Sequence, residues 1–324
     1  MSNSSNKKKC DYCTKLAAVV RPESGESFCV SHFLKSVEKQ VAKTIKKHRL
    51  FKPEDCIAVA FSGGKDSVAL IHLLTGIEKQ FPKSEILPFY VQEGIKGYQD
   101  EALEIVQEHT KSLDLPLKIY NFKDLFGITL DDLIIKSKKL PKSEQVTPCT
   151  YCGILRRWSF NAAAKELNAD VLATGHTLDD EAQTVLMNIM RGDLYRIVRT
   201  PRSLETNSTK AKIFPPRVKP LQKITEREVV LYNYYKKLRY QFIECPHREA
   251  ALRNPLRTFL DEQSLRDPSL KFTLFNVGTQ LSNILHSHYP TDQLKTCNIC
   301  GGPTNHEVCK KCQVLAKLGV QFPD

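Results

Sequence analysis

Hydrophobic residues between positions 55 and 191 fall into short continuous runs that alternate with longer stretches of helical length. The short runs predict buried strands, and they cover residues 56–61, 86–91, 117–122 and 171–174. The longer stretches predict helices, and they cover residues 67–80, 99–113, 153–167 and 179–190. Strands joined by helix-length crossovers predict an α/β fold with a doubly wound parallel sheet, whose site lies at the carboxyl ends of the strands.

The rest of the chain predicts further units around this sheet. Residues 201–217 are polar and contain proline, which favours a loop, and the chain after residue 226 has a helical pattern. We predict a metal-binding module, a central α/β domain, a helical segment and a second metal-binding module, over residues 1–35, 36–250, 251–290 and 291–324. In the helical part, residues 272–286 are a candidate surface for a homodimer.

The charge of the chain adds a prediction about its partner. Its 324 residues, 41% of them hydrophobic, suffice for one substantial core with small appendages. Lys and Arg number 48 against 36 Asp and Glu, so the formal net charge is +12. This balance favours a polyanion such as nucleic acid, although a solvated basic surface without a partner has the same composition.

Compartment and redox state follow from the N-terminus and the cysteines. The N-terminal residues are polar and basic, and no run of about 18 apolar residues occurs, so we predict a cytoplasmic protein without a membrane span. The chain has 11 cysteines, mostly in CxxC pairs. Such pairs in a reducing compartment indicate metal ligation, with disulfides as the weaker interpretation.

The sequence SGGKDS at residues 62–67 follows an apolar strand and opens a helix. Gly63 and Gly64 let backbone amides approach phosphate oxygens, and the helix N-terminus adds partial positive charge. The motif differs from a Walker A loop, which needs four residues between its first glycine and the Gly-Lys pair. A strand-to-helix turn capped by Asp66 or Ser67 is the alternative. We interpret the SGGKDS loop as a phosphate-binding loop.

A second motif, GHTLDDEA at residues 175–182, again joins a strand to a helix. The paired carboxylates of Asp179 and Asp180 could bind Mg²⁺ on a pyrophosphate group or orient a reacting oxygen. Acidic residues in the first turn of a capped helix are the structural alternative.

Cys149 and Cys152 form a CxxC pair followed by Arg156 and Arg157, and Cys245 lies far away in the chain. Three thiolates leave one coordination position open, as a catalytic metal site requires. A redox pair that forms a persulfide and then a disulfide, or a structural zinc site with a further ligand, remain alternatives.

Two groups of four soft ligands occur at the ends of the chain. Their spacing is typical of zinc sites, and coincidental cysteines in turns are the alternative. The groups are Cys10, Cys13, Cys29 and His32, and Cys297, Cys300, Cys309 and Cys312. Zinc modules in these positions most simply build an RNA-docking surface, and pure scaffolding is the alternative. Cys56 alone remains outside these sets, and its place in the first strand predicts a core role.

In content and order, these motifs resemble the tRNA 2-thiouridine synthetases of the PP-loop ATP pyrophosphatase superfamily, including the TtuA type and the cytosolic wobble-uridine thiolases. Residues 93–98 and 190–193 match the family as well, so the resemblance covers nearly the whole chain. It implies the adenine-nucleotide α-hydrolase-like fold. Gln92 departs from the family, whose members often carry an aspartate there, which removes a carboxylate from that strand end.

The resemblance implies that ATP is split between its α and β phosphates with the help of Mg²⁺. It places the phosphates on Ser62, Gly63, Gly64, Asp66 and Ser67. It places Ala60 and Val91 beside the adenosine and gives Gly175 the role of allowing close approach of the nucleotide. Lys65 or Arg156 would offset the charge of the leaving pyrophosphate. The implied catalytic residues are Asp66, Arg156 and Asp180, of which Asp180 orients or deprotonates a reacting group.

The resemblance also implies that Cys149, Cys152 and Cys245 hold a 4Fe-4S cluster whose open iron carries sulfur. The sulfur would come from a ubiquitin-like carrier with a terminal thiocarboxylate or from free sulfide, and AMP would activate a uridine C2 oxygen of a flipped tRNA base for its replacement. The target is a T-loop or an anticodon wobble uridine. The CxxH spacing of Cys29 and His32 resembles the TtuA type, which acts on the T-loop, somewhat more.

Two other classes of protein share part of this pattern. A PP-loop ligase or amidase acting on a small molecule would need neither the zinc modules nor the third cysteine. A non-catalytic zinc-ribbon RNA-binding protein would gain nothing from the SGGKDS and GHTLDD motifs together. Consumption of ATP that depends on tRNA separates these classes from a thiolase.

Overall fold

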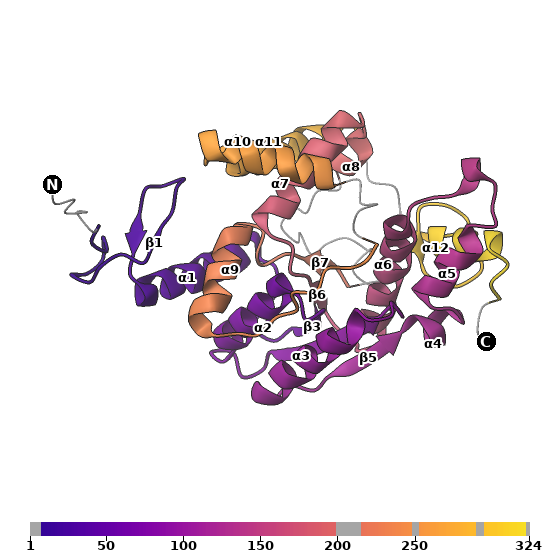
Figure 1. Ribbon diagram of the computed structural model, residues 1–324, viewed down its shortest axis with the longest axis horizontal. Helices are drawn as coiled ribbons and strands as arrows, with labels where there is room; N and C mark the ends of the chain where they lie inside the picture. The colour runs from indigo at the N-terminus through magenta and orange to yellow at the C-terminus, as the bar shows by residue number, and fades with distance from the viewer. Residues whose placement is uncertain (1–7, 199–214, 248–252, 290–294, 322–324) are drawn as a thin grey trace.

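A five-stranded parallel sheet forms the centre of the computed structural model, which describes residues 8–198, 215–247, 253–289 and 295–321 (Figure 1). The order of the strands is β5-β4-β3-β6-β7. They span Lys118–Asn121, Glu85–Gln92, Cys56–Ala60, Val171–Ala173 and Arg217–Val218, given in that order. The chain builds outward from β3 on one side and then returns to build outward from β6 on the other. The gap between the carboxyl ends of β3 and β6 is therefore the topological switch point, where such sheets bind ligands.

The strands are joined by helical crossovers. The main helices after β3, β4, β5 and β6 are α2 (Lys65–Glu78), α3 (Gln99–Ser112), α6 (Pro148–Glu166) and α7 (Leu178–Met190). Shorter helices complete the crossovers, namely α4 (Phe122–Phe126), α5 (Leu130–Ser137), the 3₁₀ helix η1 (Lys142–Glu144) and α8 (Leu194–Val198). Helices on both faces explain why the strands are almost continuously apolar.

Alternate residues of β3 face two separate cores. Ile57 and Val59 pack into the core that α2 covers together with α1 (Val30–His48) and α9 (Glu226–Lys236). Ala58 and Ala60 pack into the core of α4, α5, α6 and α12 (Lys310–Lys317). The small side chains of the second set let α6 approach this face of the sheet closely, and α6 carries Cys149 and Cys152.

After β7 the chain is helical in three stretches: α9 (Glu226–Lys236), α10 (Asn254–Arg266) and α11 (Leu270–Leu285). A capping box between Thr225 and Glu228 starts α9, and Lys237 ends it in the left-handed conformation with φ of 56°. Residues 238–247 then run without helix toward Cys245. Helix α11 packs against α7 and α8.

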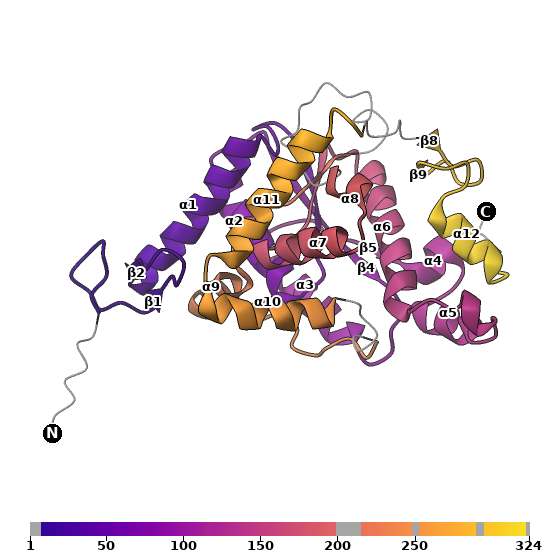
Figure 2. The ribbon, with the colours of Figure 1, turned by 90° about the horizontal axis from the view of Figure 1, so that it is seen from above.

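The two terminal modules lie at opposite ends of the molecule (Figures 1 and 2). The N-terminal module contains β1 (Val19–Val20), β2 (Ser27–Phe28) and the start of α1 (Val30–His48). The C-terminal module contains β8 (Lys295–Thr296), β9 (Pro303–Thr304) and α12 (Lys310–Lys317), and α12 packs against α6.

The predicted α/β class, the parallel sheet and the four main crossover helices are confirmed. Three local features differ from the pattern-based predictions. Helix α6 begins at Pro148 rather than near residue 153, α1 runs without a break across the boundary expected at residues 35 and 36, and residues 237–247 after α9 are not helical. Most of the loop predicted over 201–217 lies outside the described residues. Within the described part of the chain, no helix is long and apolar enough to cross a membrane.

Two helical glycines allow a matched test of packing. A Cβ added to Gly278 in α11 would lie 2.4 Å from a methyl group of Val185 in α7, whereas one added to Gly76 in α2 would meet no atom within 4 Å. Gly278→Ala should therefore lower the free energy of unfolding by about 1–3 kcal/mol through overpacking. Gly76→Ala should raise it by about 0.5–1 kcal/mol through helix propensity. Denaturant unfolding measures both, and stabilisation by both changes would contradict the close contact between α11 and α7.

Candidate functional site

The SGGKDS loop lies at the carboxyl end of β3, at the switch point of the sheet. Gly63 has a φ of +76°, and a Cβ there would lie 2.8 Å from the backbone carbonyl oxygen of Ala102. Gly64 has an extended backbone and starts α2 without any side-chain cap, so the first amides of the helix remain available to a ligand. This geometry suits phosphate binding.

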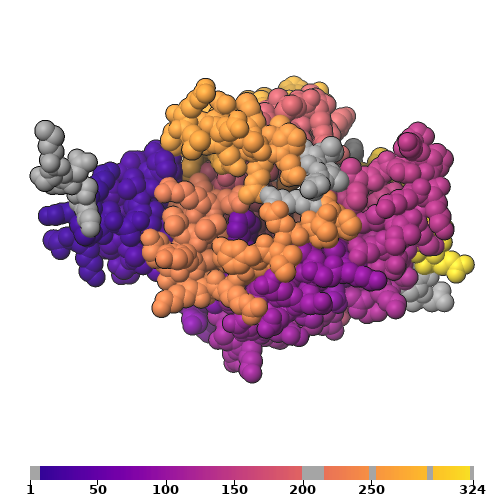
Figure 3. All heavy atoms as spheres, viewed as in Figure 1, coloured from indigo at the N-terminus to yellow at the C-terminus, as the bar shows by residue number. Residues whose placement is uncertain are grey.

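The loop is held in shape before any ligand binds. The buried Oγ of Ser67 donates to the carbonyl of Gly64 at 2.9 Å and accepts the backbone N–H of Ser62 at 3.2 Å. Two residues from the C-terminal part of the chain also bind the loop. The side chain of Asn233 donates to the carbonyl of Lys65 at 2.8 Å, and the backbone N–H of Gln241 donates to the carbonyl of Gly63 at 2.9 Å. In Figure 3, purple atoms from the first third of the chain are visible in a small hollow bordered by orange atoms from residues after 215.

The charges around the loop form a compact cluster. Lys65 lies 2.9 Å from a carboxylate oxygen of Asp66 and 3.0 Å from one of Glu226. Burial raises the pKa of Asp66 to about 6, a rise that Lys65 opposes and that Asp180 and Glu226 increase. The Oδ1 atom of Asp66 is buried without a hydrogen-bond partner among the described residues. An unpartnered carboxylate oxygen beside two other carboxylates has the donor set that Mg²⁺ requires.

The GHTLDD motif lies beside the SGGKDS loop. A Cβ on Gly175 would lie 3.0 Å from the backbone carbon of Asp66, so this glycine lets the two loops approach each other. Asp180 accepts hydrogen bonds from the backbone and hydroxyl of Thr177 at 3.0 and 3.2 Å, both through Oδ2, and thus caps α7. Asp179 accepts from Lys271 and from the backbone of Glu226. Asp179 therefore ties α7 to α9 and α11.

Arg156 and Glu93 form an ion pair at 2.6 Å that joins α6 to the end of β4. Glu93 is almost fully buried, and its negative charge raises the pKa of Arg156 further above its usual range. Gln99 donates to the other oxygen of Glu93, which fixes the carboxylate. The Nε atom of Arg156 is buried without a partner among the described residues. Sequence reasoning missed the role of Glu93, although it lies in the stretch 93–98 that resembles the family.

Cys149 and Cys152 occupy the first turns of α6, three residues apart on one face, with Arg156 one turn further on. The Cys149 thiol donates to the carbonyl of His247 at 3.3 Å, which brings the segment of Cys245 to the same place. Burial raises the pKa of Cys152 to about 11, against the opposing charge of Arg156, and the neighbouring sulfurs of Cys245 and Cys149 raise it further. The three cysteines therefore face one site.

The Cys245 segment is braced by a residue pair that sequence reasoning also missed. Asp131 in α5 accepts from His247 at 3.0 Å through Oδ1 and from the backbone N–H of Lys96 at 3.0 Å through Oδ2. These residues line a cavity of about 730 Å³ together with Gly94 and Pro246. Asp131 thus connects the Glu93 loop to the Cys245 segment. A histidine two residues after a ligand-type cysteine was the available signal.

Ala60 ends β3 and Val91 lies one residue before the end of the neighbouring β4, and both side chains belong to the core on the α6 face of the sheet. Beyond them, several arginines converge near α6. The pKa of Arg157 is lowered by desolvation and by the positive charges of Arg196 and Arg253. Burial and Arg157 lower the pKa of Arg217 to about 10. Such a concentration of guanidinium groups favours a polyanion.

Each terminal group brings its four ligand atoms together within 4.8 Å. In the first, the sulfurs of Cys13 and Cys29 lie 3.7 Å apart, and in the second the pairs Cys297–Cys312 and Cys300–Cys309 lie 3.8 and 3.7 Å apart. Sulfurs bound at about 2.3 Å to a tetrahedral zinc lie about 3.8 Å from one another. The geometry therefore fits zinc and excludes a disulfide between these pairs.

Comparison with known proteins agrees with this arrangement. A family profile described as a PP-loop domain matches residues 33–263. The cytoplasmic tRNA 2-thiolation protein 1 of Drosophila pseudoobscura pseudoobscura is 36% identical over 312 residues, which cover 96% of this chain and 88% of the relative. The tRNA 2-thiolation protein NcsA of Haloferax volcanii is 33% identical over 96% of this chain and 99% of its own. The chain belongs to the tRNA 2-thiolation protein family.

A solved structure agrees with this family assignment over the whole fold. The U34-tRNA thiolase NcsA from Methanococcus maripaludis, determined with its 4Fe-4S cluster, matches with a TM-score of 0.81 and 30% identity. The match covers 98% of both chains, so it includes both terminal modules of this tRNA 2-thiolation family member. The predicted family and its PP-loop fold are thus confirmed.

The two glycines of the SGGKDS loop offer a matched test of its geometry. Gly63→Ala should lower the free energy of unfolding by about 1–2 kcal/mol, because a side chain is strained at positive φ and would meet the Ala102 carbonyl. It should also weaken ATP binding. Gly64→Ala should retain stability, because its Cβ would have only an ordinary contact with Ser62 at 3.5 Å. Calorimetric ATP titration and denaturant unfolding measure both effects. Equal stability of the two variants would contradict the loop geometry.

The brace at Asp131 predicts the reactivity of Cys245 in the metal-free protein. Asp131→Ala should speed alkylation of the Cys245 thiol, because the segment of His247 loses its anchor. Asp132→Ala is the matched control, because among the described residues Asp132 bonds only to Thr129 in its own helix cap. Mass spectrometry after timed iodoacetamide treatment gives the rates. An equal rate in both variants would show that Asp131 does not hold the segment.

Proposed function

We propose that this chain is a tRNA 2-thiouridine synthetase, a cytoplasmic ATP-dependent sulfurtransferase that replaces the C2 oxygen of a tRNA uridine with sulfur. One observation carries the proposal: the Glu93–Arg156 pair joins the helix of Cys149 and Cys152 to the strand beside the SGGKDS loop. One ion pair thus links the candidate nucleotide site to the three-cysteine site. Neither a small-molecule ligase nor an RNA-binding module requires that connection.

The reaction needs two steps because a carbonyl oxygen is a poor leaving group. In the first, the uridine O2 bonds to the α-phosphorus of ATP, pyrophosphate leaves, and N3 loses its proton. In the second, hydrosulfide adds to C2, the C2–O2 bond breaks as AMP departs, and the proton of hydrosulfide ends on N3. The net change is the replacement of oxygen by sulfur at the expense of one ATP.

The residues of the chain divide this work. The amides and hydroxyls of the SGGKDS loop hold the phosphates, and Ala60 and Val91 flank the adenosine. Asp66 offers its unpartnered Oδ1 to Mg²⁺ on the pyrophosphate. Lys65 and Arg156 offset the charge that develops as pyrophosphate leaves, and their carboxylate partners keep them oriented before ATP binds. Asp180 orients the reacting base from the start of α7.

Cys149, Cys152 and Cys245 fit a 4Fe-4S cluster better than a single zinc ion. Their sulfurs do not form a group as compact as the two terminal ones, which suits a cluster because each cysteine binds a different iron. When bound, the cluster would supply an open iron for hydrosulfide. The structure of the Methanococcus maripaludis thiolase contains such a cluster. A persulfide on one of these cysteines is the alternative sulfur carrier.

The substrate we propose is a tRNA with the anticodon wobble uridine as target. The matching solved structure is named a U34-tRNA thiolase, and the arginines around Arg157 offer a polyanion a path to the site. The T-loop uridine is the alternative target. The sulfur would come from a thiocarboxylate carrier or from sulfide. Zn²⁺ in both terminal groups would complete the cofactors. Helix α11 is the candidate surface of a homodimer.

Loss of one cysteine tests the cluster. After anaerobic purification and reconstitution, the wild type should contain about four iron and four acid-labile sulfide per chain. Cys245→Ala should lose both the iron and the thiolation of tRNA, while ATP binding persists. The control is Cys56→Ala, because Cys56 begins β3 away from the site and burial raises its pKa to about 11. Iron and sulfide assays, absorption spectra and nucleoside analysis supply the readouts.

Two results would contradict this proposal in different parts. Thiolation retained by Cys245→Ala would overturn the three-cysteine site. Thiolation by a wild type that holds zinc but no iron would overturn the cluster and favour the persulfide route.

A further inference from the structure

Helix α1 has a strongly basic exposed face far from the residues described above. Five exposed lysines lie within about 120° of the helix circumference, because each residue turns the helix by about 100°. They are Lys35, Lys39, Lys43, Lys46 and Lys47, which we call the lysine stripe. The opposite face carries Phe33, Val37 and Val41, which are completely buried in the core. The stripe therefore lies on a rigid, well-anchored helix.

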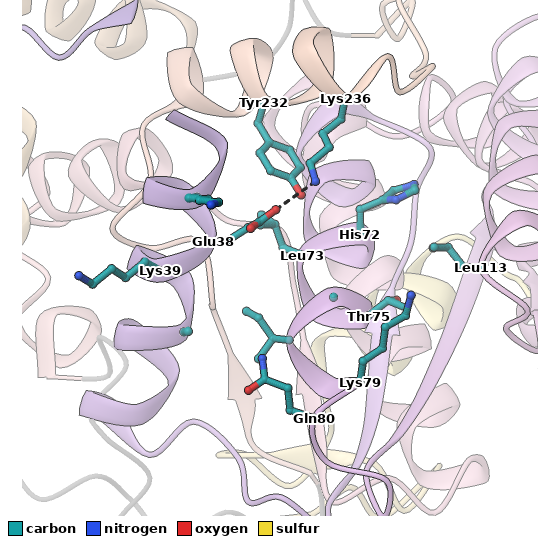
Figure 4. A pocket seen from close by; sticks show the side chains of 14 residues that line it. Glu38, Lys39, His72, Leu73, Thr75, Lys79, Gln80, Leu113, Tyr232 and Lys236 are labelled. Atoms are coloured by element: carbon teal, nitrogen blue, oxygen red, sulfur yellow. Dashed lines mark ion pairs between the residues drawn. The ribbon is translucent and has the colours of Figure 1, made fainter. Parts of the chain in front are cut away.

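The stripe borders a groove of about 580 Å³ between α1, α2 and α9. Lys35 and Lys39 enter it from α1, Lys79 from the end of α2 and Lys236 from α9, and the single carboxylate is Glu38. Figure 4 shows Glu38 and Lys236 facing each other across the groove, where they pair at 3.1 Å, while Lys39 extends away from them. The remaining lysines leave the groove with net positive charge.

This charge has no counterpart among the carboxylates of the described residues. No carboxylate of the described residues forms an ion pair with a lysine of the stripe. The local field is strong enough to act on neighbouring groups. Burial is the main cause that lowers the pKa of His48 and the pKa of Lys223, the latter to about 8. The positive charge of Lys47 lowers both pKa values further. A surface of this kind gains from an external polyanion that replaces bound counterions.

We infer that the lysine stripe and its groove bind the sugar-phosphate backbone of RNA, and hold the body of the tRNA substrate. Protein interfaces are depleted of lysine and centre on apolar or aromatic anchors, whereas the only large hydrophobic residue exposed on α1 is Val30. A membrane-surface helix would present its apolar face outward, but that face is buried here. Lysine side chains without apolar anchors match evenly spaced phosphates.

The position of the groove suits a contact remote from the reacting base. Lys79 lies about 20 Å from the SGGKDS loop along α2, because each helical residue advances about 1.5 Å. Lys8, Lys9 and Lys15 of the N-terminal module, which precedes α1, are also exposed. The inference rests on the proposed function for the identity of the RNA, while phosphate binding at this surface is independent of thiolation.

The test replaces part of the stripe without altering the site. The variant Lys35→Gln, Lys39→Gln, Lys43→Gln keeps helix propensity and removes three charges. The control removes three exposed lysines elsewhere, as Lys111→Gln, Lys123→Gln, Lys136→Gln. Fluorescence anisotropy measures the binding of an unmodified tRNA transcript to each protein. Repeating the measurement over a range of NaCl concentrations gives the affinity and its salt dependence. ATP titration checks that both variants retain the nucleotide site.

The stripe variant should bind tRNA about 10- to 100-fold more weakly than the control, and the slope of log K against log salt should fall by about 1 per lysine. In turnover assays its KM for tRNA should rise while kcat stays near the wild-type value. Equal affinity and slope in variant and control would overturn the inference. Polyglutamate serves as a second ligand in the same binding assay. If the stripe variant bound polyglutamate more weakly than the control but bound tRNA equally well, the inference would be overturned and the surface assigned to an acidic protein.

These outcomes separate the two proposals. Lysine-dependent tRNA binding by a protein that thiolates no uridine would support this surface and contradict the proposed function. Normal thiolation by a stripe variant that binds tRNA as tightly as the control would support the proposed function and contradict this surface.

Discussion

The contact between Gly175 and the backbone of Asp66 is the constraint on which the site depends. Parallel strands β3 and β6 are neighbours, and the loops that follow them must pass each other at the switch point of the sheet. A Cβ on residue 175 would lie 3.0 to 3.1 Å from that backbone, which is tighter than most contacts of this kind, so glycine favours the approach observed there. Because of this approach, the start of α7 adds the carboxylate of Asp180 to those of Asp66 and Glu226. Charges from three distant parts of the sequence thus meet around one lysine.

Partly buried ion pairs hold the cations of this cluster and of the cysteine site. The two cations proposed to assist ATP cleavage are already paired, Lys65 with Asp66 and Glu226, and Arg156 with Glu93. Pairing lowers the cost of burying these charges and fixes their direction before a nucleotide arrives. The unpartnered atoms that remain, Oδ1 of Asp66 and Nε of Arg156, mark where the described residues leave hydrogen-bonding capacity for a ligand.

The sequence predicted the sheet, its crossovers and the content of the two terminal ligand groups, because these follow from local periodicity and spacing. Helix α6 was predicted to begin too late, at residue 153, whereas Pro148 suits the first turn of a helix. Helix α1 was missed because its many lysines hide the apolar positions at residues 33, 37 and 41. The pairs Glu93–Arg156 and Asp131–His247 join residues far apart in the chain, so neither has a local pattern that could reveal it.

Helix α6 is supported at a distance by the C-terminal module. The indole of Trp158 in α6 packs against Gly302, where an added Cβ would lie 2.8 Å from the indole nitrogen. The ammonium group of Lys311 lies 4.1 Å from the centre of the Trp158 ring. Leu315 of α12 is fully buried in the same core as Leu155. A protein truncated before residue 295 would therefore expose the outer side of the helix that carries Cys149, Cys152 and Arg156. Residues 295–321 thus stabilise the helix that carries the cysteine pair.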